Sequence, residues 1–167
     1  MGLGDRLRTR KPLTETVRLP LDPTQYGQAE RELETATLAL EDARSRGVTD
    51  LSRLQEDAAA ARVQLDACEC ELVTLRALPP ADWEALVGLH PATEEQRARG
   101  ATWNTATFRA ALLAASTVPG EGEAPLTEAD WEVLAKDGSL TLGELNTLFN
   151  TAVDLNTRAP ARAVGNG

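Results

Sequence analysis

The segment LSRLQEDAAAARVQLDACECELVTLRA, residues 51–77, decides the fold, because its apolar residues recur at alternating spacings of three and four. These positions span four heptads and are Leu51, Leu54, Ala58, Ala61, Leu65, Cys68, Leu72 and Leu75. Such a repeat is typical of a helix with one long apolar seam. We therefore expect one continuous helix from about residue 51 to about residue 77.

A matching seam lies just upstream, in residues 24–46. Its members also fall three or four apart and are Tyr26, Ala29, Leu33, Ala36, Leu40 and Ala43. Gly47 suits the left-handed conformation that ends a helix, and so short a loop predicts an antiparallel helical hairpin over residues 24–77. Because an alanine-rich seam buries little area, we favour the binding of a partner helix or of another copy (a homo-oligomer) along it. A self-sufficient rigid spacer is the alternative.

The N-terminal residues have a different pattern. Residues 13–21, LTETVRLPL, alternate apolar and polar side chains, which indicates a strand that Pro20 and Pro23 cut short. One strand is not stable alone, so we expect an extended arm or pairing with another chain. Residues 1–18 carry five basic and two acidic side chains, and we interpret residues 1–23 as a basic, extended N-terminal arm.

Prolines and capping signals divide residues 80–157 into short helices. Pro79 and Pro80 end the hairpin, and capping boxes predict helix starts at Thr93, Thr127 and Thr141. We expect a five-helix bundle over residues 80–157, followed by a flexible tail at residues 158–167. The predicted fold class is therefore all-α: a helical hairpin, a small bundle and a short extended N-terminal segment.

The charge and the hydropathy of the chain argue against nucleic acids and membranes as partners. The formal net charge is −9, and residues 79–157 alone carry four basic and twelve acidic side chains. Because a surface this acidic repels a phosphate backbone, we expect that the protein does not bind nucleic acid. No apolar run is long enough to span a membrane, and the N-terminus lacks the apolar core of a secretory signal. We expect a cytosolic protein with no membrane association.

The sequence contains no constellation that favours catalysis. His90 is the single histidine, so it cannot form a histidine metal cluster, and it fits a structural role at a helix end. Cys68 and Cys70 would point apart on a helix, which makes a poor metal clamp. Asp137 to Glu144 is similar to half of a calcium loop but lacks oxygen ligands at the first positions. We therefore predict no enzyme activity, no cofactor and no metal site.

Short motifs follow one another along nearly the whole chain. They are TVRLPLD (16–22), WEAL (83–86), LHPATEEQ (89–96), WNTATF (103–108), ALLAAS (111–116), GELNTLFN (143–150) and DLN (154–156). Their order and spacing resemble the tail assembly chaperones of long-tailed actinobacterial phages. The chain departs from that pattern at residues 105–111, where the family has a proline-bearing stretch, and in a long loop at residues 119–125.

The resemblance implies a function without catalysis. Members of that family bind the tape measure protein, keep its long apolar helix soluble and help to recruit tail tube subunits in the host cell cytoplasm. They are absent from the mature virion. The alternative is a structural tail or connector protein that the virion retains.

Such a chaperone needs an apolar groove with a charged exterior. The candidate partner-binding residues are large apolar side chains of the predicted bundle: Trp83, Leu86, Trp103, Phe108 and Leu112. Aromatic residues anchor most interfaces, but they also fill cores. Taken singly, each of these residues fits the core of the bundle better than a groove.

Overall fold

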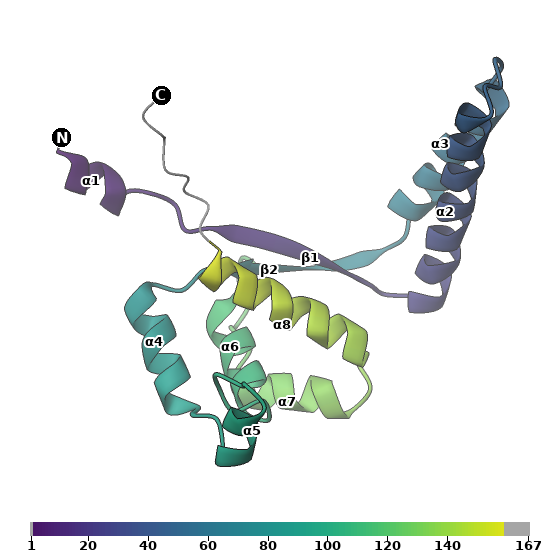
Figure 1. The fold of residues 1–167 in the computed structure, drawn as a ribbon. Coiled ribbons are helices and arrows are strands. Elements are labelled where there is room, and N and C mark those ends of the chain that lie inside the picture. Colours follow the sequence, from purple (N-terminus) through teal and green to yellow (C-terminus); the bar gives the residue numbers. More distant parts are fainter. Residues whose placement is uncertain (1, 159–167) are drawn as a thin grey trace. The chain divides into compact units, whose positions relative to one another are not determined.

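The computed structural model describes residues 2–158, and Figure 1 shows its helices and strands. The elements in chain order are α1 (Leu3–Arg8), β1 (Thr14–Pro20), α2 (Pro23–Ser45), α3 (Ser52–Asp66), β2 (Cys70–Arg76), α4 (Pro80–Leu89), α5 (Glu94–Ala98), α6 (Phe108–Ser116), β3 (Thr117–Val118), α7 (Glu128–Lys136) and α8 (Leu142–Thr157). The protein is about 59% helical and contains a three-stranded antiparallel sheet, so the predicted all-α class is wrong. The flexible tail predicted at residues 158–167 lies, from residue 159 on, outside the described residues.

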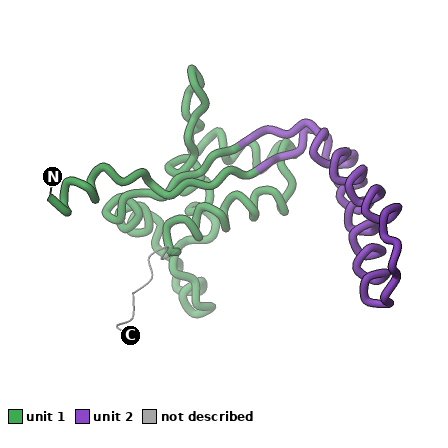
Figure 2. Tube along the Cα trace, turned by 90° about the horizontal axis from the view of Figure 1, so that it is seen from above, with its two compact units in different colours: residues 1–17, 73–167 green, residues 18–72 purple. Residues whose placement is uncertain are grey.

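The chain divides into two compact units, coloured separately in Figure 2. Unit 1 contains residues 1–17 and 73–167, and unit 2 contains residues 18–72. Strands β1 and β2 each contribute residues to both units.

Unit 2 contains the predicted hairpin of α2 and α3. Asp22 caps α2, because its Oδ1 accepts hydrogen bonds from the backbone N–H groups of Thr24 and Gln25, both at 3.0 Å. Gly47 has φ of 73°, the left-handed conformation expected of the residue that follows a helix. The buried residues of the hairpin all come from the predicted seams: Ala29, Leu40, Ala43, Ala61 and Cys68. These five seam positions are therefore confirmed.

The predicted continuous helix over residues 51–77 is wrong beyond Asp66. Helix α3 ends at Asp66, and the chain re-enters a regular element as strand β2 at Cys70. Cys68, Leu72 and Leu75 kept the heptad spacing, but Val73 and Thr74 are β-branched and favour a strand. Leu75 is fully buried from the strand, whereas Leu72 is 60% exposed.

The sheet has the strand order β1-β2-β3. The strand predicted at residues 13–21 is confirmed as β1, but its partner is β2 of the same chain, neither of the two arrangements that we expected. The N–H of Ala77 donates to the carbonyl of Leu13 at 2.8 Å, and the hydroxyls of Thr16 and Thr74 are 3.0 Å apart. Helix α1 occupies residues that we predicted to be extended.

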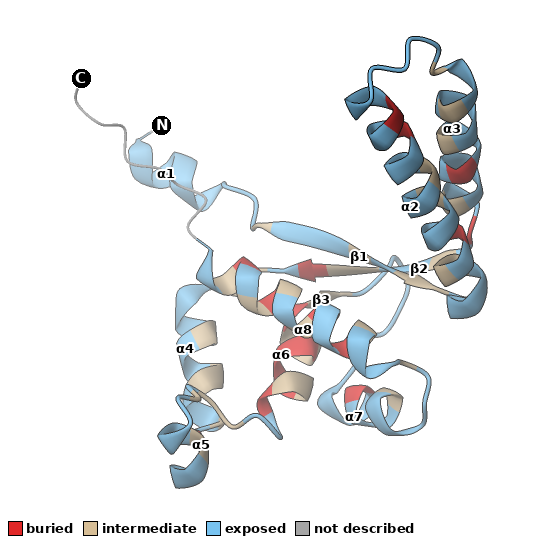
Figure 3. Cartoon of the chain, turned by 45° about the vertical axis from the view of Figure 1, so that its right-hand side comes forward, coloured by how far each residue is buried: buried red, intermediate tan, exposed pale blue. Residues whose placement is uncertain are grey.

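Unit 1 buries its core between helices and β2, as Figure 3 shows by colour. The fully or almost fully buried apolar side chains come mainly from α6 and α8: Leu75, Phe108, Ala111, Leu112, Leu113, Trp131, Leu145, Leu148, Ala152 and Leu155. The three predicted capping boxes are confirmed at Thr93, Thr127 and Thr141. Each of these threonines accepts a hydrogen bond from the N–H three residues later, which fixes where α5, α7 and α8 begin.

Candidate functional site

Three of the five predicted binding residues belong to one aromatic cluster of unit 1. Phe108 stacks on Trp103 with ring centroids 4.7 Å apart and meets Trp83 edge to face at 5.7 Å. Phe149 lies 6.2 Å from the same ring, and His90 lies 6.0 Å from it. Offset and edge-to-face geometries of this kind are favourable for aromatic rings. Phe108 is the centre of the cluster.

Burial separates the predicted binding residues into two groups. Phe108 and Leu112 are fully buried, so neither presents a surface to a partner while unit 1 stays folded. Trp83, Leu86 and Trp103 are half-buried. Of the five, Leu86 alone lines a large, mostly apolar groove in unit 1. Whether the half-buried three contact a partner stays a prediction.

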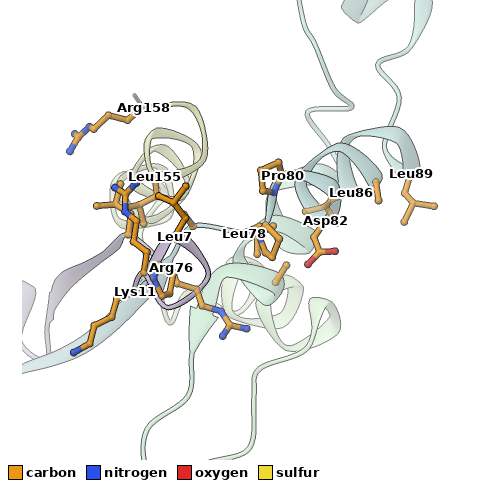
Figure 4. A pocket seen from close by; sticks show the side chains of 17 residues that line it. Leu7, Lys11, Arg76, Leu78, Pro80, Asp82, Leu86, Leu89, Leu155 and Arg158 are labelled. Atoms are coloured by element: carbon orange, nitrogen blue, oxygen red, sulfur yellow. The ribbon is translucent and has the colours of Figure 1, made fainter. Parts of the chain in front are cut away.

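That groove has a volume of about 950 Å³ and is drawn in Figure 4. Its lining is mostly apolar and comes from segments far apart in the sequence: Leu7, Pro12, Leu13, Ala77, Leu78, Pro79, Pro80, Ala85, Leu86, Leu89, Ala115 and Leu155. Two of its leucines are notably exposed, Leu89 at 76% and Leu7 at 59%. Contiguous exposed apolar surface of this kind is typical of binding sites. We call it the leucine groove.

Two prolines and two hydrogen bonds position the segments that line the groove. Pro79 and Pro80 cannot extend strand β2, and Pro80 instead opens helix α4. The N–H of Leu78 donates to Oδ1 of Asn156 at 2.7 Å, which ties the segment after β2 to α8. The Nδ2 of Asn156 in turn donates to the carbonyl of Ala152 at 2.7 Å. This part-buried pair of hydrogen bonds fixes Leu155 beside the segment that leads into α4.

Four cations surround the apolar lining: Arg10, Lys11, Arg76 and Arg158. Asp82 is the one carboxylate among the lining residues. Within residues 2–158, none of the four cations forms an ion pair. Elsewhere in unit 1, Arg8, Arg99 and Lys136 pair with carboxylates on their own helices, whereas Arg97 and Arg109 form no ion pair among the described residues. The groove is therefore a site of uncompensated positive charge on an acidic protein.

Three polar side chains that the sequence singled out take part in local hydrogen bonds. Nδ1 of His90 lies 2.9 Å from the hydroxyl of Thr107, next to the aromatic cluster. Hydrogen bonds from the side chain and backbone of Ser139 lower the pKa of Asp137, and Glu144 accepts the N–H and hydroxyl of Thr141. In the described part of the chain, no group of three or more His, Cys, Asp or Glu residues could hold a metal ion.

The sequence did not reveal the leucine groove. Arg10, Arg76 and Arg158 are more than sixty residues apart from one another, and the residues around Arg76 were predicted as helix. No local signal links such positions, since only the strand pairing and the end of α8 bring them together. A weak hint was available in Leu89, whose apolar side chain lies outside the core face of its helix.

Comparisons with known proteins leave the identity open. No protein-family model matches the chain, and neither a curated protein nor a solved structure shows significant similarity to it. Among the described residues, the helices are too short or too polar for a membrane span.

Proposed function

We propose that the protein is a phage tail assembly chaperone that binds and keeps soluble the tape measure protein, acting in the host cell cytoplasm and helping to recruit tail tube subunits. The leucine groove carries this proposal. It offers exposed leucines to an apolar helix, while the acidic surface of the chain keeps the complex in solution. The order of motifs along the chain supports the same assignment.

The size of the groove suits one helix. A helix with side chains is about 10–12 Å wide and rises 1.5 Å per residue, so 950 Å³ holds about two turns. A longer segment binds if one face is buried and the other stays in water. This binding geometry covers the apolar stripe of a long helix without enclosing the whole helix. A chaperone of an extended partner requires this.

Co-expression tests the proposal directly. The protein is produced together with the tape measure protein encoded beside it, and the soluble fraction and co-purification of the latter are measured. We expect soluble complex only when both are present. No gain in solubility and no complex would refute the chaperone assignment.

Two exposed leucines provide a matched pair of variants. Leu89→Asp places a charge in the groove, whereas Leu142→Asp places one at a leucine that is 66% exposed and does not line the groove. Both variants should fold, because neither removes a core side chain. We expect Leu89→Asp to abolish solubilisation and Leu142→Asp to retain it. Mass spectrometry of purified virions should find the protein absent, and a fixed copy number there would indicate a structural tail or connector protein.

A further inference from the structure

The charge around the leucine groove differs in sign from the rest of unit 1. The described residues of this unit carry ten Lys or Arg and fourteen Asp or Glu side chains. The groove nevertheless has four cations and one carboxylate in its lining. The cations come from three separate places, namely the segment before β1, the last residue of β2 and the residue after α8. A run of neighbouring cations on one helix is usually a solvated helix face. These four cations come from distant segments, so that explanation does not apply to them.

The charges are also distributed unevenly along the groove. In Figure 4, Lys11 and Arg158 lie on the side of Leu155, whereas Asp82 lies with Leu86 and Leu89 of α4. The backbone N–H of Arg158 still bonds to the carbonyl of Asp154 at 2.8 Å, which fixes its main chain at the end of α8. The groove thus has an apolar floor and one cationic end.

We infer that the leucine groove selects an amphipathic helix that carries carboxylates at one end, with those carboxylates beside Lys11, Arg76 and Arg158. The inference rests on the proposed function and specifies the chemistry of the bound segment. Apolar side chains of that helix cover Leu7, Leu86 and Leu89, and its acidic end supplies the missing counter-charges. A basic helix end is disfavoured because four cations belong to the lining of the groove.

Synthetic peptides test this selection without knowledge of the natural partner. Three fluorescently labelled, Leu- and Ala-rich helical peptides of eighteen residues differ in their last turn, which holds two Glu, two Gln or two Lys. The charged pair is placed at the C-terminal end, where Glu opposes the helix dipole and lowers intrinsic helicity. A preference for the Glu peptide therefore cannot come from helix propensity.

Fluorescence anisotropy with the full-length protein gives the affinities. Several ion pairs at a partly desolvated edge should make the Glu peptide bind on the order of tenfold more tightly than the Gln peptide, and the Lys peptide most weakly. The preference should shrink in 0.5 M NaCl, because salt screens partly exposed pairs. Equal affinities for the three peptides would overturn the inference.

Two variants connect the preference to the groove. The triple variant Lys11→Gln, Arg76→Gln, Arg158→Gln should lose the discrimination, while Arg97→Gln, outside the groove on α5, should keep it. Discrimination that survives in the triple variant would refute the inference. So would a protein that is dimeric alone and monomeric as the triple variant, since a second copy would then occupy the groove.

The outcomes separate this inference from the proposed function. Solubilisation of the tape measure protein without any charge preference would overturn the inference and leave the chaperone function standing. A clear charge preference without solubilisation would support the inference and refute the chaperone function.

Discussion

Replacement of Phe108 by Ala should unfold unit 1 while sparing unit 2. Phe108 is fully buried, and its ring meets Trp83, His90, Trp103 and Phe149. Removing a buried phenylalanine costs about 3–5 kcal/mol of unfolding free energy, through lost transfer energy and the cavity left behind. Since small domains have only about 5–15 kcal/mol in all, we expect most of the stability of unit 1 to be lost.

Thermal unfolding of unit 1 is measured by tryptophan fluorescence. All three tryptophans, Trp83, Trp103 and Trp131, belong to unit 1, so their fluorescence reports on this unit alone. For a unit of about a hundred residues, a loss of about 4 kcal/mol lowers the fluorescence midpoint by roughly 15–30 °C. Circular dichroism at 222 nm should retain the contribution of α2 and α3.

A matched variant separates core from groove. Leu89→Ala removes an exposed side chain and should leave the fluorescence midpoint within a few degrees of the wild type. If Phe108→Ala melted equally close to the wild type, the aromatic cluster would not be the core of unit 1. Phe108 would then become available as a binding residue, as the sequence first suggested.

Three further predictions concern the hairpin, pH and metals. Leu40→Asp should open the hairpin and expose it to trypsin, at a cost of several kcal/mol, whereas Leu38→Asp, at a 57% exposed position of the same helix, should not. Hydrogen bonds from the hydroxyl and N–H of Thr127 lower the pKa of Asp130 in the folded protein. The ionised Asp130 therefore stabilises the fold above the pKa of the unfolded chain, about 3.9, and this stabilisation is lost as the pH falls through the lower pKa of the folded protein. Asp130→Asn should therefore lower the melting temperature at pH 7, with the difference from wild type closing in acid. Calcium should leave the melting temperature unchanged, and a rise of several degrees that Glu144→Ala abolishes would contradict this.

Local features of the fold were predictable from the sequence because they depend on neighbouring residues. The seams around Leu40 and Ala61, the left-handed Gly47 and the threonine caps of α5, α7 and α8 follow from spacings of one to four residues. The same spacing rule failed at Leu72 and Leu75. Their three-residue interval fits a heptad, but β1 requires a partner strand, and residues 70–76 supply it.

The candidate site was less predictable than the fold. The sequence indicated large apolar residues as candidates for partner binding, yet two of them, Phe108 and Leu112, are buried in the structure. The leucine groove instead combines Leu7, Leu89 and the cations around them, which no sequence interval connects. Because the sequence had placed residues 51–77 on one helix, it could not bring Arg76 next to Lys11.

The acidic body and the cationic groove act over different distances. With a formal charge of −9, the chain repels an acidic segment from afar, and this repulsion opposes the selection proposed for the groove. At physiological ionic strength, however, charges more than about 8 Å apart are largely screened. A carboxylate that reaches the leucine groove therefore interacts mainly with the charges of its lining, which are four cations and Asp82. Repulsion from the acidic body is therefore weak at the groove, and attraction to the cations of the lining is the larger effect in the proposed selection.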